Sequence, residues 1–584
     1  MTYFILSGRT LPLLLWLVLR RKPVCVIKVI AEFPGFGPLL ERLVGQLQHR
    51  GHARPLEDEL PELTRYTGLD FFANTNFRYD RIEDWVERTF GFDVHGPVLG
   101  DLAIAYKKVI WAKVYSLAQC AIVIQRLLET KTENDFKVLG TTGHMSEIYQ
   151  NHYGRPLPDR APVVRPEIPH PATNFLITVL AIFHASAWIA VRMRFRVAAP
   201  EDTFFGTNLT SIYKLSEKSK PYFEAVGDHS KIRLILNTPA MVDIARGNIS
   251  DIHYGLRGDG RYTVSEGFAL AAATVVAMVR FQLHFGGYPA MFFIAIILLP
   301  FKRAVYRGLF NRYRFSYFFL SNEYSEESAV LASEARRVGC TVMGRIHGVP
   351  VTEILQPVWR HIDMDICYLP LKIPFATDYR RTWPEAMTLR PVRSRGLIER
   401  RRQQANTAKS NDIVFFFNAG IYLEQTTETV LAVARAFPDR TVYLGVKGNR
   451  VVEKICADMV AELTVAEENI VKPDALSYDL MLMGSYAFVD FSTIAIEAVQ
   501  FGLNTFVLDF RPEDQPLLYR QLPDFCVRSP EEAIERIWDL ESGQCRYPKE
   551  QYEKIMGLSE KSISEAMAED LYGTPPNSAV ARIV

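Results

Sequence analysis

The sequence predicts an α/β protein built on parallel sheets, and two stretches support that prediction. Between residues 412 and 539, short runs of branched and aromatic residues alternate with amphipathic helical segments. Five strands at this spacing are typical of one doubly wound sheet. Upstream, the strand-like Tyr317–Ser321 precedes a helical segment that stops at Gly339, and Thr341–Ile346 then resumes as a strand. A strand, a helix and a second strand at this spacing form a βαβ unit.

The chain is long enough for several domains. At roughly 150 residues per domain, its 584 residues predict two to four of them. We expect an N-terminal α/β domain over residues 1–375, a basic linker over 376–411, a second α/β domain over 412–545 and a helical tail over 546–584. The linker is predicted because residues 390–410 hold seven lysines and arginines, one acid and no aromatic residue.

Charge and cysteine content exclude several classes of protein. The 67 lysines and arginines nearly balance 66 acids, so the net charge is only +1. A dedicated nucleic-acid binder usually carries a basic excess, so we expect no nucleic-acid partner. The seven cysteines form no Cys-x-x-Cys pair, which argues against a disulfide scaffold and a zinc ribbon. Such scattered thiols suit a reducing cytoplasm.

Apolar stretches raise the mean hydropathy to about zero, which is high for a soluble protein of this size. The longest are Asn174–Val191 and Phe268–Phe301. Basic residues follow both of them, at Arg192–Arg196 and at Lys302–Arg314. An apolar segment with a cationic flank is typical of a protein that lies on an anionic membrane surface.

Three arrangements of these inserts, 174–191 and 268–314, stay open from the sequence. They form a peripheral or monotopic attachment to the inner membrane, or buried helices of an α/β core, or true spanning helices. A spanning hairpin at 268–301 would place Arg280 near the membrane centre, which is costly. We expect a cytoplasmic protein attached to an anionic membrane surface, with burial in the core as the alternative.

The stretch Ser485–Phe510 carries the clearest chemical signal. An apolar strand ends at Asp490, and Ser492 and Thr493 then occupy the first positions of the next helix. A helix N-terminus at the carboxyl end of a parallel strand can bind phosphate. Glu497 follows one turn later on the same face, where its carboxylate could reach a ribose hydroxyl pair. The alternative is a well-capped helix of any α/β protein.

This stretch resembles the C-terminal donor domain of two-domain, GT-B-type glycosyltransferases. The nearest pattern is that of bacterial capsule and surface-polysaccharide transferases and of teichoic-acid-type glycerophosphotransferases. The matching residues are Asp490-Phe491-Ser492-Thr493, Glu497-Ala498, Gly502 and the strand Phe506–Asp509. A second match is Glu326–Pro350, in which His347-Gly348 stands where the family places a histidine facing the cleft between domains.

The resemblance implies two Rossmann-like domains that face a cleft, with the apolar helices as additions in the N-terminal half. It implies transfer of a sugar from a nucleotide-sugar donor to a surface-polysaccharide or lipid-linked glycan acceptor. His347 is the first candidate for the acceptor base, since an imidazole suits this role near neutral pH. His144 and Glu147, at the Gly140–His144 turn, are the alternatives. A retaining enzyme would need no base, and His347 would then contact the donor phosphates.

Further donor-site candidates follow two other strands. Asn418 and Gly420 follow the first strand of the second domain, and Lys447 and Arg450 follow its second strand. The two cations could neutralise a diphosphate, although an ordinary surface loop reads the same way. The family often has a Lys-x-His-Pro turn here, and this chain lacks its His-Pro.

We expect neither a metal nor a cofactor, because GT-B enzymes generally stabilise the leaving diphosphate with helix dipoles and cations. Asp363-Met364-Asp365 leads directly into a predicted strand, which argues against a metal-binding loop.

Two other functions remain open from the sequence. One is an isomerase like the UDP-sugar 2-epimerases, although that family has a Ser-Gly-Gly turn where this chain has Ser492-Thr493-Ile494. The other is a non-catalytic scaffold that keeps the two-domain fold, which the missing His-Pro favours.

Overall fold

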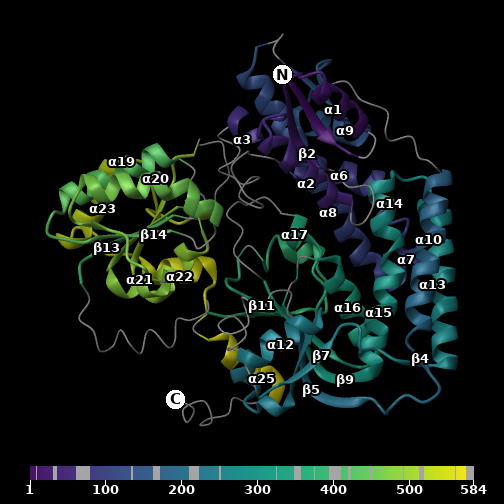
Figure 1. Cartoon of the computed structure of the whole chain (residues 1–584). Helices are drawn as coiled ribbons and strands as arrows, with labels where there is room; N and C mark the ends of the chain where they lie inside the picture. Colours follow the sequence, from purple (N-terminus) through teal and green to yellow (C-terminus); the bar gives the residue numbers. More distant parts are fainter. Residues whose placement is uncertain are drawn as a thin grey trace.

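The structure is a computed structural model whose described residues form parallel sheets of three, seven and six strands and a two-stranded parallel pair, β4 (Met193–Arg194) with β8 (Tyr262–Thr263) (Figure 1). It describes residues 1–7, 10–29, 36–60, 79–132, 136–161, 171–208, 222–248, 251–321, 323, 325–346, 357–373, 375–393, 410–417, 422–446, 450–475, 477–490, 492–511, 518–559 and 561–573.

The sheet formed by residues 413–527 has six parallel strands. Its order is β15 (Ile470–Val471), β14 (Val442–Val446), β13 (Ile413–Phe417), β16 (Tyr486–Asp490), β17 (Asn504–Leu508) and β18 (Cys526–Val527). Its helices are α19 (Leu423–Ala436), α20 (Arg450–Ala466), α21 (Ser477–Met483), α22 (Ile494–Phe501) and α23 (Pro530–Glu541). Counted along the chain, this is the doubly wound order 3-2-1-4-5-6, so the predicted sheet is confirmed. The sequence analysis missed only β18, a strand of two residues.

The central sheet has seven parallel strands and the same winding. Its order is β7 (His253–Leu256), β6 (Ile232–Leu236), β5 (Glu201–Asn208), β9 (Tyr313–Leu320), β10 (Thr341–Arg345), β11 (Ile366–Leu369) and β12 (Thr388–Pro391). The predicted βαβ unit is β9, α16 (Glu326–Arg337) and β10. Strand β12 occupies residues predicted as linker, and residues 394–409 of that linker lie outside the described residues. Two doubly wound sheets confirm the predicted fold class.

A third, three-stranded parallel sheet lies at the N-terminus, in the order β2 (Val24–Val29), β1 (Thr2–Leu6) and β3 (Lys137–Leu139). Its helices include α1 (Leu11–Leu19), α2 (Phe36–His49) and α9 (Gly143–Tyr153). The 28-residue helix α8 (Ala103–Thr130) contacts α9 and also α16 of the central sheet, so it joins the two units. Residues 1–375, predicted as one domain, therefore contain the three-stranded sheet, six strands of the central sheet and the β4–β8 pair.

Apolar helices stand beside the central sheet in Figure 1. They are α10 (Pro171–Ala190), α13 (Val264–Phe285), α14 (Ala290–Ile297) and α15 (Leu299–Arg312). Helices α10 and α13 are long and apolar enough to cross a membrane, whereas α14 is packed into the core. The shorter elements are α3 (Leu56–Glu59), α6 (Asp80–Thr89), α7 (Gly96–Leu99), η1 (Gly100–Leu102), β4 (Met193–Arg194), η3 (His229–Lys231), α12 (Pro239–Asn248), β8 (Tyr262–Thr263), α17 (Pro357–Arg360), η4 (Tyr379–Thr382), η5 (Leu518–Gln521), α24 (Lys549–Met556) and α25 (Ile563–Tyr572).

The basic residues after Phe301 form part of the folded core region rather than a free cationic patch. Lys302 pairs with Glu326, and Arg303 and Arg307 both contact the buried carboxylate of Glu334. Arg312 pairs with Glu201 at 2.8 Å. The cations from Lys302 to Arg314 are predicted to face a membrane, and these four form ion pairs within the fold. Their partners lie far away in the sequence, so the local charge pattern could not show them.

Glu334 is the centre of this cluster, because it is only 1% exposed and contacts three arginines, Arg303, Arg307 and Arg337, at 2.7–2.9 Å. Glu334→Gln is expected to destabilise the fold by about 3 kcal/mol, since it removes the buried charge that pairs with three half-buried arginines. Asp101→Asn is a matched control: Asp101 also contacts Arg303 at 2.9 Å but is 61% exposed, so we expect a change below about 1 kcal/mol. Urea unfolding measures both, and equal effects would contradict this role of Glu334.

The same cluster predicts a dependence of stability on pH. Burial alone would raise the pKa of Glu334, but Arg307, Arg303 and Arg337 hold it below its usual value. A carboxyl whose pKa is lower in the folded state stabilises the fold above its unfolded pKa. This contribution is lost as the pH falls through the folded pKa, so wild type and Glu334→Gln should converge in stability under acid.

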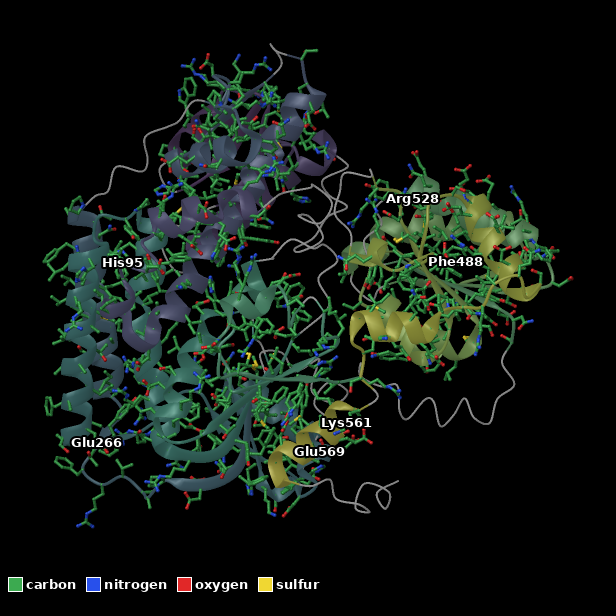
Figure 2. All side chains as sticks on the ribbon, turned by 180° about the vertical axis from the view of Figure 1, so that it is seen from behind. His95, Glu266, Phe488, Arg528, Lys561 and Glu569 are labelled. Carbon is green, nitrogen blue, oxygen red and sulfur yellow. The ribbon has the colours of Figure 1, made fainter. Side chains whose placement is uncertain are left out.

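The C-terminal helix α25 packs against the central sheet rather than the six-stranded one. Asp570 accepts a hydrogen bond from the Tyr368 hydroxyl at 2.9 Å and pairs with Arg390 at 2.8 Å. Met567 is buried in the same cluster as Phe319 of β9. Glu569 marks this helix in Figure 2, and Lys561 lies just before it. The segment predicted as a helical tail thus contains α24 and α25, and α25 packs on the central sheet.

Candidate functional site

The carboxyl edge of the six-stranded sheet is the candidate donor site. The strand order reverses between β13 and β16, and ligands of doubly wound sheets bind outside the carboxyl ends of the strands at such a point. Three neighbouring parallel strands, β14, β13 and β16, end at this edge. The predicted donor residues follow these three strands in the chain, so one topology explains why they would act together.

The described part of the chain contains only some of these residues. Asn418, Gly420 and Lys447 lie outside the described residues, and Arg450 is the first residue of α20. Ser492, Thr493 and Glu497 are described, and they start α22 directly beyond β16.

The N-terminus of α22 has little side-chain capping. Thr493 occupies the capping position without a side-chain hydrogen bond, and Ser492 Oγ accepts only a long contact of 3.4 Å from the Ile494 N–H. Ser492, Thr493 and Ile494 are half-buried, so packed side chains do not cover this helix end completely. The first N–H groups of a helix carry a partial positive charge, which favours an anion there.

Tyr519 fixes the start of this helix from η5. Its hydroxyl donates to the Ser492 carbonyl at 2.8 Å. Burial raises the pKa of Tyr519, with smaller contributions from Cys526 and the Glu497 carboxylate. Ser492, Glu497 and Tyr519 therefore lie close together, and Glu497 stands within the first turn of α22 as predicted.

A group of buried charges at the same edge was missed by the sequence analysis. Asp509 is 1% exposed and accepts two hydrogen bonds from Arg520, at 2.6 and 3.0 Å. Arg511 is also buried; burial lowers its pKa, and the Asp490 carboxylate opposes that shift. Arg528, which follows β18, lies 3.8 Å from Asp509 and is marked in Figure 2 with Phe488 in the middle of β16.

The Arg511 guanidinium lies near Asp490, which is the last residue of β16. A cation at this edge could help to neutralise a diphosphate held by the helix N-terminus. The signal in the sequence was an acid and an arginine directly after an apolar strand, in the run TFVLDFR.

The carboxyl edge of the central sheet is the corresponding place in the N-terminal part of the chain. Its strand order reverses between β5 and β9, where Asn208 accepts a hydrogen bond from the Ser321 N–H at 3.3 Å. Nearby, the fully buried Lys108 of α8 donates to the Glu323 carbonyl at 2.6 Å. Burial lowers the pKa of Lys108 to about 8, against the opposing pull of acids led by Glu323.

His347 itself lies outside the described residues. It follows Ile346 at the carboxyl end of β10, and β10 is the neighbour of β9 in the central sheet. The strand that leads to His347 therefore ends at the same edge as β5 and β9.

The alternative bases, His144 and Glu147, lie on α9, the helix that follows β3 of the three-stranded N-terminal sheet. The Gly140 turn between β3 and α9 was predicted and has φ +90°, which only glycine adopts easily. His144 is surrounded by aromatic rings, with ring centroids 5.7 Å from Phe90 and 5.5 Å from Phe292. His144 and Glu147 thus lie on a helix that follows the three-stranded sheet, whereas the described chain before residue 347 ends with β10 of the central sheet.

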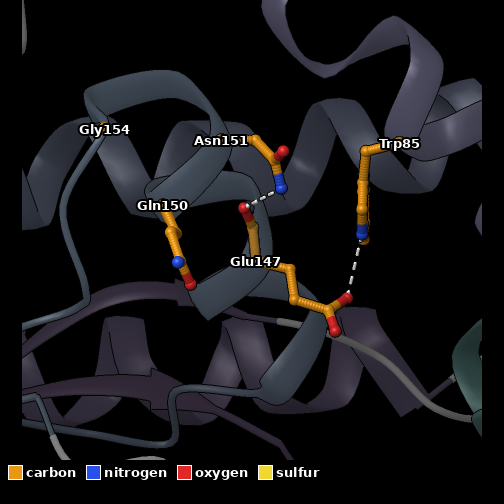
Figure 3. Close-up of a pocket in the computed structure, with 5 residues that line it drawn as sticks. All are labelled: Trp85, Glu147, Gln150, Asn151 and Gly154. Atoms are coloured by element: carbon orange, nitrogen blue, oxygen red, sulfur yellow. Dashed lines mark hydrogen bonds between the residues drawn. The ribbon is translucent and has the colours of Figure 1, made fainter.

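Glu147 lines an open hollow of about 520 Å³ between α6 and α9 (Figure 3). Its carboxylate accepts a hydrogen bond from Trp85 Nε1 at 3.0 Å, and its carbonyl accepts one from Asn151 Nδ2 at 2.8 Å. Gln150 and Gly154 complete the lining.

Asp363 and Asp365 hold an arginine. The Arg336 guanidinium donates to both carboxylates at 2.7 Å, and Ile366 begins β11 as the sequence predicted. Within the described ranges, no group of three or more His, Cys, Asp or Glu residues is arranged to hold a metal ion.

Comparison with known proteins gives structural neighbours only. No family model and no curated protein matches the sequence. Similar solved structures include a UDP-GlcNAc 2-epimerase from Neisseria meningitidis bound to UDP-GlcNAc, with 11% identity, TM-score 0.39, and coverage of 63% of this chain and 97% of that one. The wall teichoic acid polymerase TagF has 9% identity and TM-score 0.39, with coverage of 69% and 98%.

A third neighbour is HepE from Anabaena in complex with UDP and glucose, with 11% identity, TM-score 0.35, and coverage of 63% of this chain and 98% of that one. These neighbours are of the GT-B type that the sequence resembles. Likeness at this level is compatible with many activities, because one fold supports many functions.

Proposed function

We propose that this chain is a metal-independent glycosyltransferase that moves a sugar from a nucleotide-sugar donor to a glycan acceptor. The observation that supports it best is the carboxyl edge of the six-stranded sheet. There the half-exposed start of α22, Glu497 in its first turn and the buried Arg511 lie beside the point where the strand order reverses.

Each of these groups has a role in the proposed reaction. The N-terminus of α22 would hold the donor diphosphate, and Glu497 would accept hydrogen bonds from the ribose hydroxyls. Lys447, Arg450 and Arg511 would supply the positive charge. The bond between the sugar C1 and the diphosphate oxygen then breaks, and the diphosphate leaves with the electron pair while these groups stabilise its charge.

The acceptor would enter from the central sheet. Its hydroxyl oxygen forms the new bond to C1, and His347 takes the hydroxyl proton. The end of β10 at the carboxyl edge of that sheet supports His347 over His144 and Glu147, which lie on α9 beside the three-stranded sheet. We propose a surface-polysaccharide or lipid-linked glycan as the acceptor, with the enzyme in the cytoplasm at the inner membrane.

A thermal-unfolding screen tests this proposal. The chain is heated with UDP-, CMP-, CDP- and GDP-linked sugars, and at least one should raise the unfolding temperature, because a ligand at about 100 times its Kd stabilises the folded state by about 2.7 kcal/mol. Product analysis of that compound then separates the activities. Transfer consumes the donor only with an acceptor, whereas an isomerase converts it alone. No shift with any compound would favour a non-catalytic scaffold.

A further inference from the structure

Helices α10 and α13 present one continuous apolar face to the outside of the molecule, which we call the α10–α13 face. Its large apolar side chains are 44–79% exposed: Phe175, Leu176, Val179, Leu180 and Phe183 on α10, and Phe268, Val276, Val279 and Leu283 on α13. The two helices lie side by side at the outer edge in Figure 1. Single exposed apolar residues are normal, but a contiguous patch of this kind marks an interaction surface.

The opposite side of the helix pair is fixed to the protein. Ile177, Ala185, Met278 and Phe285 are buried in the same core as α14. Asn174 Nδ2 also donates to the Gly286 carbonyl at 2.8 Å, and the Thr178 hydroxyl donates to Gln282 at 2.6 Å. Only 33% and 28% of the most apolar windows of α10 and α13 are buried, so these are not ordinary core helices.

The charge around the α10–α13 face is almost entirely positive. Residues 171–200 and 264–289 contain four arginines and one acid, Glu266. Glu266 caps α13 by accepting a hydrogen bond from the Thr263 N–H at 2.9 Å, and Figure 2 marks it at the end of the helix pair. Beside that end stands Phe195, 96% exposed between the exposed Arg194 and Arg196.

We propose that the α10–α13 face docks on an anionic lipid bilayer, with both helices lying in the plane of the membrane. The apolar side chains would enter the region between headgroups and acyl chains, and Arg194 and Arg196 would contact lipid phosphates. Phe195 would insert next to these two arginines.

Two other occupants fit the observations less well. A second copy of this chain on the same face would place like charges against one another, because the face has arginines and almost no acids. A spanning arrangement would have to detach the inner side of the pair from α14 and would bring Arg280 into the hydrocarbon. A bilayer surface accepts the face in its folded form.

Vesicle flotation of the full chain tests this docking, independently of the proposed glycosyl transfer. Wild type should float with vesicles of phosphatidylcholine and phosphatidylglycerol, and about tenfold less with phosphatidylcholine alone. Leu180→Glu with Phe183→Glu should lower the partition coefficient at least about tenfold. Arg194→Glu with Arg196→Glu should remove most of the preference for the anionic lipid.

Val465→Glu is the matched control, because Val465 is 86% exposed on α20, away from the face, and should float like wild type. Circular dichroism and the unfolding temperature verify that each variant is folded. Equal flotation of wild type and the folded Leu180/Phe183 variant would overturn the proposal. So would a wild type that does not bind vesicles, or one whose face instead forms a dimer that the same variant dissociates.

Discussion

Glu497→Ala is expected to lower the affinity for the nucleotide-sugar by at least about 100-fold while the chain stays folded. A carboxylate that accepts two hydrogen bonds from a ribose contributes about 1.5–3 kcal/mol for each bond to a charged group. Glu497 stands in the first turn of α22, half-buried and near Tyr519, so its loss removes contacts to the ligand rather than a core side chain. Calorimetric titration with the donor found in the thermal screen measures the effect.

Glu535→Ala provides the control for this experiment. Glu535 is an exposed glutamate on α23 of the same unit, and its removal should leave the donor affinity unchanged. An unchanged affinity for Glu497→Ala would take this residue out of the site. A loss in both variants would indicate a general effect of charge.

His347→Ala is expected to lower kcat by about 100- to 10,000-fold with little change in donor affinity, because it removes the group that takes the acceptor proton. The wild-type rate should also fall as the pH is lowered, because a protonated imidazole cannot accept the acceptor's proton. The variant should lack this fall. Steady-state rates over a pH series measure both effects.

His253→Ala is the matched control, since His253 is exposed on β7 of the same central sheet. It should turn over like wild type. A weaker donor affinity in His347→Ala, without the change in pH profile, would instead fit a retaining enzyme in which His347 contacts the phosphates. Normal turnover of His347→Ala, with loss in Glu147→Ala, would move the base to the hollow beside Trp85.

The sequence predicted the local elements of the donor unit well. The alternation after Asp412 indicated five of six strands, because each buried strand is a compact apolar run between clear turns. The spacing predicted a doubly wound sheet, but not the order of its strands. Order depends on which crossover packs on which side, and no local pattern contains that information.

The sequence did not predict which of the apolar helices are exposed and which are buried. The Phe268–Phe301 stretch divides into α13, with an exposed face, and α14, which is buried. Both are rich in the same apolar residues, so hydropathy could not distinguish a helix that faces outward from one that the core surrounds. The distinction comes from the neighbouring helices.

The candidate site was predicted where its residues adjoin a strand end. Ser492, Thr493 and Glu497 could be placed because the strand that ends at Asp490 fixed their position. Arg511 and Lys108 were missed for a physical reason: their partners, Asp490 and Glu323, are distant in the sequence. Burial of a charge depends on such long-range neighbours, and a single sequence does not display them.

Hydrogen–deuterium exchange can locate the nucleotide-sugar on the chain. The full chain is exchanged with and without the nucleotide-sugar that gives the largest thermal shift. We expect protection to be concentrated in peptides that cover the end of β16 and the start of α22, from Asp490 to Glu497, with smaller protection after β13 and β14. Unchanged exchange at Asp490–Glu497, with protection confined to peptides around Glu147, would contradict this expectation.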